Sequence, residues 1–60
     1  MWIKLHDYVY GREIAVQTQN ICVIYPFADN KGCIVSFFGA EENYIQVKET
    51  VDEIGAMITE

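Results

Sequence analysis

Apolar and polar residues alternate in several short segments along the first four fifths of the chain. In residues 2–6, Ile3 and Leu5 alternate with Lys4 and His6, and residues 13–17 alternate again. An alternation with a period of two is typical of a strand that has one buried face. Further segments rich in β-branched and aromatic residues are 21–25, 33–38 and 43–48. Turn-forming residues separate these segments, so we expect four or five short antiparallel strands in meander order.

The hydrophobic period changes after the last predicted strand. Thr50 and Glu53 have the spacing of a capping box, in which each side chain accepts a hydrogen bond from the backbone N–H of the other residue. The apolar residues that follow recur every three or four positions, at Val51, Ile54, Met57 and Ile58. This stripe predicts a helix over about 51–59. Gly55 lowers the helix propensity by about 1 kcal/mol relative to Ala, so the helix either packs closely there or is weak.

The predicted elements define one α+β domain over residues 1–60. It consists of a small, bent antiparallel β-meander of four or five strands and one C-terminal α-helix. Hydrophobic residues make up 52% of the chain and charged residues 22%, which is the composition of a folded protein. A domain of this size buries only about 60% of the surface of its unfolded chain, so its stability is marginal without a crosslink or a partner.

The loop of the central hairpin determines which residues of its two strands face each other. If residues 29–30 form a two-residue loop, the numbers of facing residues sum to 59, so Cys22 faces Phe37 and Cys33 faces Pro26. A four-residue loop shifts this sum to 61. Either register leaves the two cysteines too far apart for a disulfide bond, and we expect two reduced thiols.

The same register gives the central hairpin two apolar faces. One short helix covers about one face of a small sheet. The second face then requires either the first hairpin folded over it, as in a small barrel, or another subunit. We favour a homo-oligomer, because a marginal core gains most from burial against a copy of itself. The candidate self-association face consists of Ile21, Val23, Tyr25, Ile34 and Phe38.

Charge is distributed unevenly along the chain. Four Lys and Arg residues and nine Asp and Glu residues give a formal net charge of -5, and the excess lies entirely in residues 41–60. A net negative charge disfavours binding to nucleic acid. The acidic residues either form a solvated surface that keeps the protein soluble or form a docking surface for a basic patch on a partner protein. The candidate acidic partner surface consists of Glu41, Glu42, Glu49, Asp52 and Glu53.

Few side chains have the arrangement that catalysis or metal binding requires. His6 is followed by Asp7, but neighbours on a strand point to opposite faces, so we expect an exposed histidine at a strand end and no catalytic dyad. Neither cysteine has a basic neighbour that would lower its pKa. His6 is the one histidine, and the cysteines lack the close spacing of a zinc site. We therefore expect no enzyme activity, no metal and no cofactor.

A local group of aromatic and basic residues near the start of the chain is a second candidate site. Aromatic rings stack on bases, and basic side chains pair with phosphate, so the group would suit a small anionic ligand such as a nucleotide. The alternative is that the tyrosines cover the core and keep their hydroxyls in water. The candidate ligand cluster consists of Trp2, Lys4, Tyr8, Tyr10 and Arg12.

The distribution of apolar residues gives no signal for export or membrane insertion. The first residues read as a strand and not as a basic segment followed by a long apolar one. The longest apolar runs, such as residues 22–28, are too short to span a membrane as a helix. We expect a cytoplasmic protein without a membrane partner.

Several short motifs occur in an order that extends over nearly the whole chain. They are Ile3 and Leu5, Gly11, Asn20-Ile21, Val47-Lys48-Glu49-Thr50 and Asp52-Glu53-Ile54. In this order the chain resembles the small flagellar and swarming-motility proteins of the FlbD type, and similar short proteins of phages and mobile elements. The aromatic and cysteine-containing segment 22–38 departs from the simpler Ile/Val alternation of that family. The resemblance implies a small, non-enzymatic, β-rich module.

These observations favour a function based on binding. We expect a non-enzymatic bacterial or phage accessory protein that regulates or inhibits another protein, and that acts as a homo-oligomer. One alternative is a protein that binds or sequesters an anionic nucleotide at sites between subunits. A further alternative is a structural assembly factor of the flagellar type.

Overall fold

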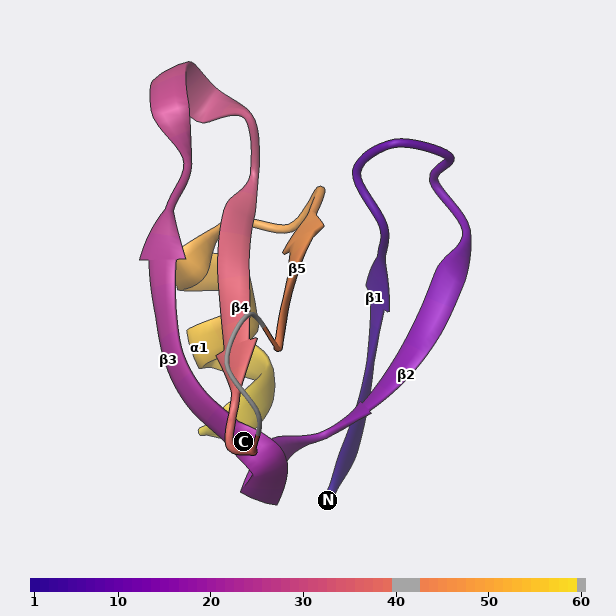
Figure 1. The fold of residues 1–60 in the computed structure, drawn as a ribbon, viewed down its shortest axis with the longest axis vertical. Helices are drawn as coiled ribbons and strands as arrows, with labels where there is room; N and C mark the ends of the chain where they lie inside the picture. Colours follow the sequence, from indigo (N-terminus) through magenta and orange to yellow (C-terminus); the bar gives the residue numbers. More distant parts are fainter. Residues whose placement is uncertain (40–42, 60) are drawn as a thin grey trace.

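The computed structural model describes residues 1–39 and 43–59. Within them the chain forms five strands and one α-helix, which confirms the predicted α+β class (Figure 1). The strands are β1 (Trp2–His6), β2 (Glu13–Gln17), β3 (Ile21–Pro26), β4 (Cys33–Phe37) and β5 (Tyr44–Val47). The helix is α1 (Val51–Ile58), and two 3-10 turns are η1 (Thr18–Asn20) and η2 (Ala28–Asn30).

The strands form two antiparallel sheets that meet side by side. One sheet pairs β1 with β2, and the other has the strand order β3-β4-β5. The backbone joins the two sheets between β1 and β5: the N–H of Tyr8 donates to the carbonyl of Gln46 over 3.0 Å, and the N–H of Lys48 donates to the carbonyl of His6 over 2.8 Å. The spatial order is therefore β3-β4-β5-β1-β2, with β3 and β2 at the two edges (Figure 1).

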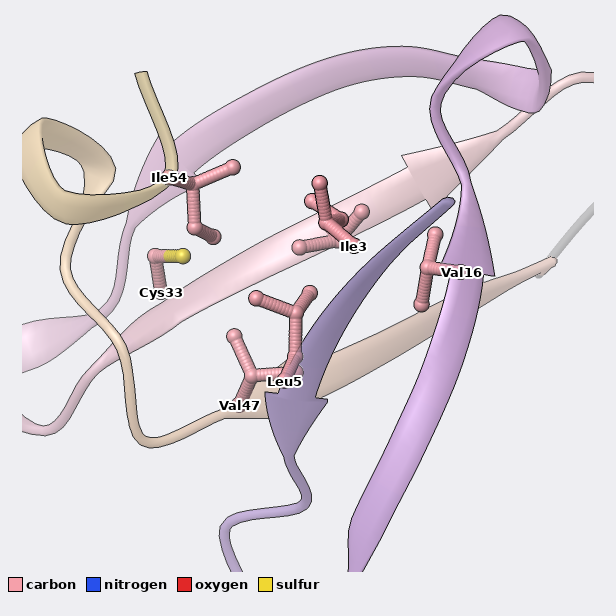
Figure 2. Close-up of a cluster of buried hydrophobic side chains, with 7 residues drawn as sticks. Ile3, Leu5, Val16, Cys33, Val47 and Ile54 are labelled. Carbon is pink, nitrogen blue, oxygen red and sulfur yellow. The ribbon is translucent and has the colours of Figure 1, made fainter. Parts of the chain in front are cut away.

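Seven of the eight buried side chains in the described residues form one cluster, to which both sheets and the helix contribute (Figure 2). Its members come from four strands and α1, and they are Ile3, Leu5, Val16, Cys33, Val35, Val47 and Ile54. The β1-β2 hairpin and α1 thus cover the same face of the β3-β4-β5 sheet. The small-barrel alternative, with the first hairpin folded over the second face, is not found in the described residues.

A bulge in β3 changes the register of the central hairpin at one end. Pro26 faces Cys33, as predicted, although the connecting loop contains η2 and is longer than two residues. At Cys22 the register shifts, so that Phe37 faces Ile21. The predicted Cys22–Phe37 pair is therefore wrong, and Ile21 packs against the core while Cys22 is exposed. An extra residue in one strand shifts the alternation by one position, so the side chain beyond the bulge lies on the other face.

The helix begins at the predicted capping box. The N–H of Glu53 donates to Oγ1 of Thr50 over 3.1 Å, and the N–H of Thr50 donates to Oε1 of Glu53 over 3.0 Å. Ile54, one residue later, is fully buried in the core. A Cβ built on Gly55 would meet no atom within 4 Å, so close packing does not require a glycine there. In the described part of the chain, no helix has the length and apolar character needed to cross a membrane.

Gly32 lies where the backbone before β4 approaches the end of β5. Its φ is +76°, in the left-handed region, and a Cβ at this position would overlap the carbonyl oxygen of Val47. The carbonyl of Gly32 also accepts a hydrogen bond from the N–H of Phe27 over 3.3 Å. Both the backbone conformation and the close approach therefore require a glycine.

We expect Gly55→Ala to increase the free energy of unfolding by about 1 kcal/mol, because alanine has the higher helix propensity and the site is open. Urea denaturation would measure the change. Ala56→Gly, at an exposed neighbouring position, should lower stability by a similar amount. A less stable Gly55→Ala variant would contradict the open surroundings of this residue.

We expect Gly32→Ala to lower the free energy of unfolding by more than about 2 kcal/mol, since left-handed strain adds to the overlap with Val47. Gly11→Ala is the matched control: Gly11 has a φ of +71°, but its neighbours are the flexible end atoms of Lys48. That variant should lose only about 1 kcal/mol. Equal losses in thermal or urea denaturation would argue against a steric requirement at Gly32.

Candidate functional site

The face of the β3-β4-β5 sheet that points away from the core carries uncharged side chains. Strand pairing places Tyr25 opposite Ile34, and Ile34 opposite Gln46. Tyr25 and Tyr44 are 47% and 54% exposed, whereas Ile34 is buried although it lies outside the core cluster. Ile34 is thus a buried side chain on the outside of the sheet, between Tyr25 and Gln46 in the strand pairing. We call this surface the outer face, and its six positions are Val23, Tyr25, Ile34, Ser36, Tyr44 and Gln46.

The structure brings together three residues of the candidate self-association face: Val23, Tyr25 and Ile34. Ile21 was wrongly included, because the bulge turns it toward the core. Phe38 is exposed but follows the last residue of β4, where its N–H donates to the carbonyl of Asn20 over 2.8 Å. Tyr44 was missed, although the alternation in residues 43–48 would have indicated it once β5 was placed beside β4.

The candidate ligand cluster is divided between the two ends of the β1-β2 hairpin. Trp2 lies at the first residue of β1 and is 67% exposed. Tyr10 and Arg12 lie in the loop after β1, where the guanidinium of Arg12 stacks 4.8 Å from the centre of the Tyr10 ring. Because the strand from Trp2 to His6 spans about 13 Å, these aromatic side chains do not meet.

The basic residues of that cluster already have acidic neighbours. Nζ of Lys4 lies 3.9 Å from a carboxylate oxygen of Glu13, and Nε of Arg12 lies 3.9 Å from one of Asp7. A shallow depression at the hairpin loop is lined by Arg12 together with both of these carboxylates. An anionic ligand there would meet two negative charges and one positive charge. The geometry therefore does not favour the nucleotide-binding alternative.

Asp7 organises the loop between β1 and β2. Its Oδ1 accepts a hydrogen bond from the N–H of Tyr10 over 2.7 Å, and its Oδ2 accepts one from the N–H of Arg12 over 2.9 Å. The hydrogen bond from Tyr10 has the largest effect on the pKa of Asp7, and together with the Arg12 N–H and charge it lowers that pKa despite some desolvation. The carboxylate is engaged in turn formation.

His6 and Glu49 form a pair that the sequence interpretation did not identify. Oε1 of Glu49 accepts the backbone N–H of His6 over 2.9 Å, and Oε2 lies 2.7 Å from Nδ1 of the His6 ring. Burial has the largest single effect on the pKa of Glu49 and raises it. The hydrogen bonds from the ring and backbone of His6, together with the backbone N–H of Glu49 and the charge of His6, outweigh burial, so the pKa of Glu49 is lowered. His6 is thus no isolated strand-end histidine.

This pair changes the interpretation of the candidate acidic partner surface. The side chain of Glu49 is only 11% exposed, so it is not available as a surface charge. Asp52 and Glu53 are exposed at the start of α1, where Glu53 completes the capping box. Glu41 and Glu42 lie outside the described residues. The inclusion of Glu49 was therefore wrong, because its burial depends on a contact with a strand 43 residues away.

Both cysteines are free, as predicted, but their surroundings differ. Burial raises the pKa of the Cys33 thiol, and the negative charge of Glu49 raises it further. This thiol therefore remains protonated and serves as a small core residue. Within residues 1–39 and 43–59, no three His, Cys, Asp or Glu side chains lie close enough to hold a metal ion.

Comparisons with protein-family models, curated proteins and solved structures found no match to this chain. The resemblance to the FlbD-type proteins therefore stays a prediction. Of the surfaces described here, the outer face combines exposed aromatic side chains with a buried centre at Ile34, and we take it as the candidate binding site.

Stability should decrease on acidification through the loss of the His6–Glu49 pair. The pKa of Glu49 is lowered from its ordinary 4.5 in the folded protein. The contribution of Glu49 to the free energy of unfolding is therefore present above pH 4.5 and is lost as the pH falls through the pKa that Glu49 has in the folded protein. Urea unfolding of the wild type and of Glu49→Gln, from about pH 7 to about pH 3, would measure this effect. We expect the variant to be less stable near neutrality.

The difference in stability between the two proteins should shrink toward low pH. Asp7 is present in both, so its own titration cancels in the comparison. A difference that stays constant across the range would mean that the charge of Glu49 does not contribute to stability.

Proposed function

We propose that this protein is a non-enzymatic protein-binding module that associates with a second copy of itself through the outer face. The observation that carries the proposal is an uncharged sheet face whose Val23, Tyr25 and Tyr44 side chains remain exposed after α1 and the β1-β2 hairpin have both packed on the other side. Exposed aromatic patches on a small domain mark interaction surfaces more often than isolated exposed residues do.

The charge distribution supports a second copy as the occupant. The chain carries a net charge of -5, so two copies that meet at their acidic segments repel each other. None of the six outer-face positions is charged. Two copies that meet at this face therefore avoid placing like charges opposite each other.

The side chains of the outer face suit an interface of modest size. About half of each tyrosine side chain is exposed, which corresponds to about 100 Å² per residue. Tyr25 and Tyr44 from two copies would remove roughly 400 Å² from water, worth about 10 kcal/mol before the entropy of association is subtracted. This area is small for a specific interface, so we expect the contact through the outer face to dissociate on dilution.

A function without catalysis is supported by the roles that the ionisable side chains already have. Glu49 accepts two hydrogen bonds from His6, Asp7 holds the β1-β2 loop, and Cys33 is buried in the core. Each of these groups stabilises the fold. In this proposal the assembled protein acts on another protein by occupying its surface.

We expect Tyr44→Lys to reduce the mass that light scattering measures in solution. A lysine on each copy brings two positive charges together at the interface, whereas the folded monomer tolerates it because Tyr44 is exposed. Trp2→Lys is the matched control, since Trp2 is an exposed aromatic residue of the other sheet. Wild type and Trp2→Lys should show equal masses above the 6.9 kDa of one chain at high concentration.

The masses should decrease on dilution, and circular dichroism should show the same fold in all three proteins. A wild type of 6.9 kDa up to the highest accessible concentration would overturn the proposal. A Tyr44→Lys variant with the same mass as the wild type would also overturn it.

A further inference from the structure

The outer edge of β2 presents backbone groups that β1 does not use. The N–H of Thr18 donates to the carbonyl of Met1, and the N–H of Asp7 donates to the carbonyl of Arg12. In the uniform register between these bonds, hydrogen-bonded pairs alternate with non-bonded pairs. The backbone groups that point away from β1 are therefore those of Glu13, Ala15 and Gln17.

The two edges of the molecule differ in how well they are protected against strand pairing. β3 contains the bulge at Cys22, ends at Pro26 and contacts α1. Bulges, prolines and covering helices are the usual devices that prevent pairing at a sheet edge. β2 contains neither proline nor bulge and pairs in an unbroken register with β1. In the described structure it lies at the outside of the sheet (Figure 1).

The sequence of β2 is self-complementary at this edge. We infer that the β2 strands of two copies pair in antiparallel orientation, centred on Ala15. This register uses all five residues of the strand, and it places Glu13 of each copy opposite Gln17 of the other. A register centred on Glu13 would instead place two carboxylates opposite each other, which is unfavourable.

The same register also continues the apolar side of the sheet. Ile14 and Val16 point inward. In this register, Ile14 of each copy would lie opposite Val16 of the other copy. Ile14 is only half-buried in one chain, so pairing would cover more of it. The small Ala15 side chains, exposed on the other side, allow the two strands to approach without a clash.

This contact goes beyond the proposed function, because it uses an edge of the other sheet and not the outer face. A copy with two separate self-complementary surfaces contacts two different neighbours. The wild type then assembles beyond a dimer. Loss of either surface leaves a dimer held by the other one.

The experiment compares four variants with the wild type by light scattering at high concentration. Ala15→Lys places two lysines opposite each other at the β2 edge, and Tyr44→Lys disrupts the outer face. Each of these two single variants should form a dimer, with twice the 6.9 kDa mass of one chain. The variant that carries both substitutions should be a monomer of 6.9 kDa. Ala56→Lys, the same substitution at an exposed alanine of α1, should match the wild type.

Amide hydrogen exchange of the Tyr44→Lys dimer tests the edge contact residue by residue. The amides of Glu13 and Ala15 should exchange about ten-fold more slowly in this dimer than in the double variant. The amides of Ile14 and Val16 donate toward β1 and should be protected in both proteins, which verifies that the hairpin is folded.

Fast exchange at Glu13 and Ala15 in Tyr44→Lys, or an Ala15→Lys variant with the mass of the wild type, would overturn the edge contact and leave the outer-face proposal standing. A mass that falls with Ala15→Lys but not with Tyr44→Lys would support the edge contact and overturn the outer-face proposal.

Discussion

The carboxylate of Glu49 accepts hydrogen bonds from both the backbone and the ring of His6, and it does so where the two sheets meet. The backbone bonds between β1 and β5 lie beside it. Glu49 also directly precedes Thr50, the residue that caps α1, so the same contact lies next to the start of the helix. This joint between the sheets brings Ile3 and Leu5 of one sheet beside Val47 of the other in one buried cluster.

The joint also explains why the molecule has one protected face and one exposed face. By attaching the β1-β2 hairpin at the side of β5, it directs the hairpin toward the surface that α1 also covers. A chain of 60 residues has no further described element for the opposite surface. The exposed tyrosines there, and the unpaired edge of β2, follow from this one arrangement, and both are surfaces that another polypeptide chain can bury.

Local features of the fold were predictable from the sequence, whereas features that depend on distant contacts were not. The strands, the turns and the Thr50–Glu53 cap depend on residues within a few positions of each other, and their patterns are visible in the sequence. The bulge at Cys22 depends on packing of the whole hairpin, so its effect on Ile21 was not visible.

The prediction of the candidate sites was limited for the same reason, because these sites depend on contacts between residues far apart in the sequence. Glu49 reads as one of several surface acids until His6 is placed beside it. Trp2 and Tyr10 are close in the sequence, which suggested that they form a cluster. They do not, because the extended strand β1 separates them. The outer face was found in part, because alternation identifies a shared face within each hairpin, but Tyr44 required the pairing of β4 with β5.

The long sequence separation of the His6–Glu49 contact has a consequence for the folding kinetics of the chain. The pairings of β1 with β2, β3 with β4 and β4 with β5 all join neighbouring segments, whereas this contact joins residues 43 positions apart. The entropy of closing a loop increases with its length, so the hairpins form more readily than the joint between them. We therefore expect the two sheets to dock against each other late in folding, after their hairpins have formed.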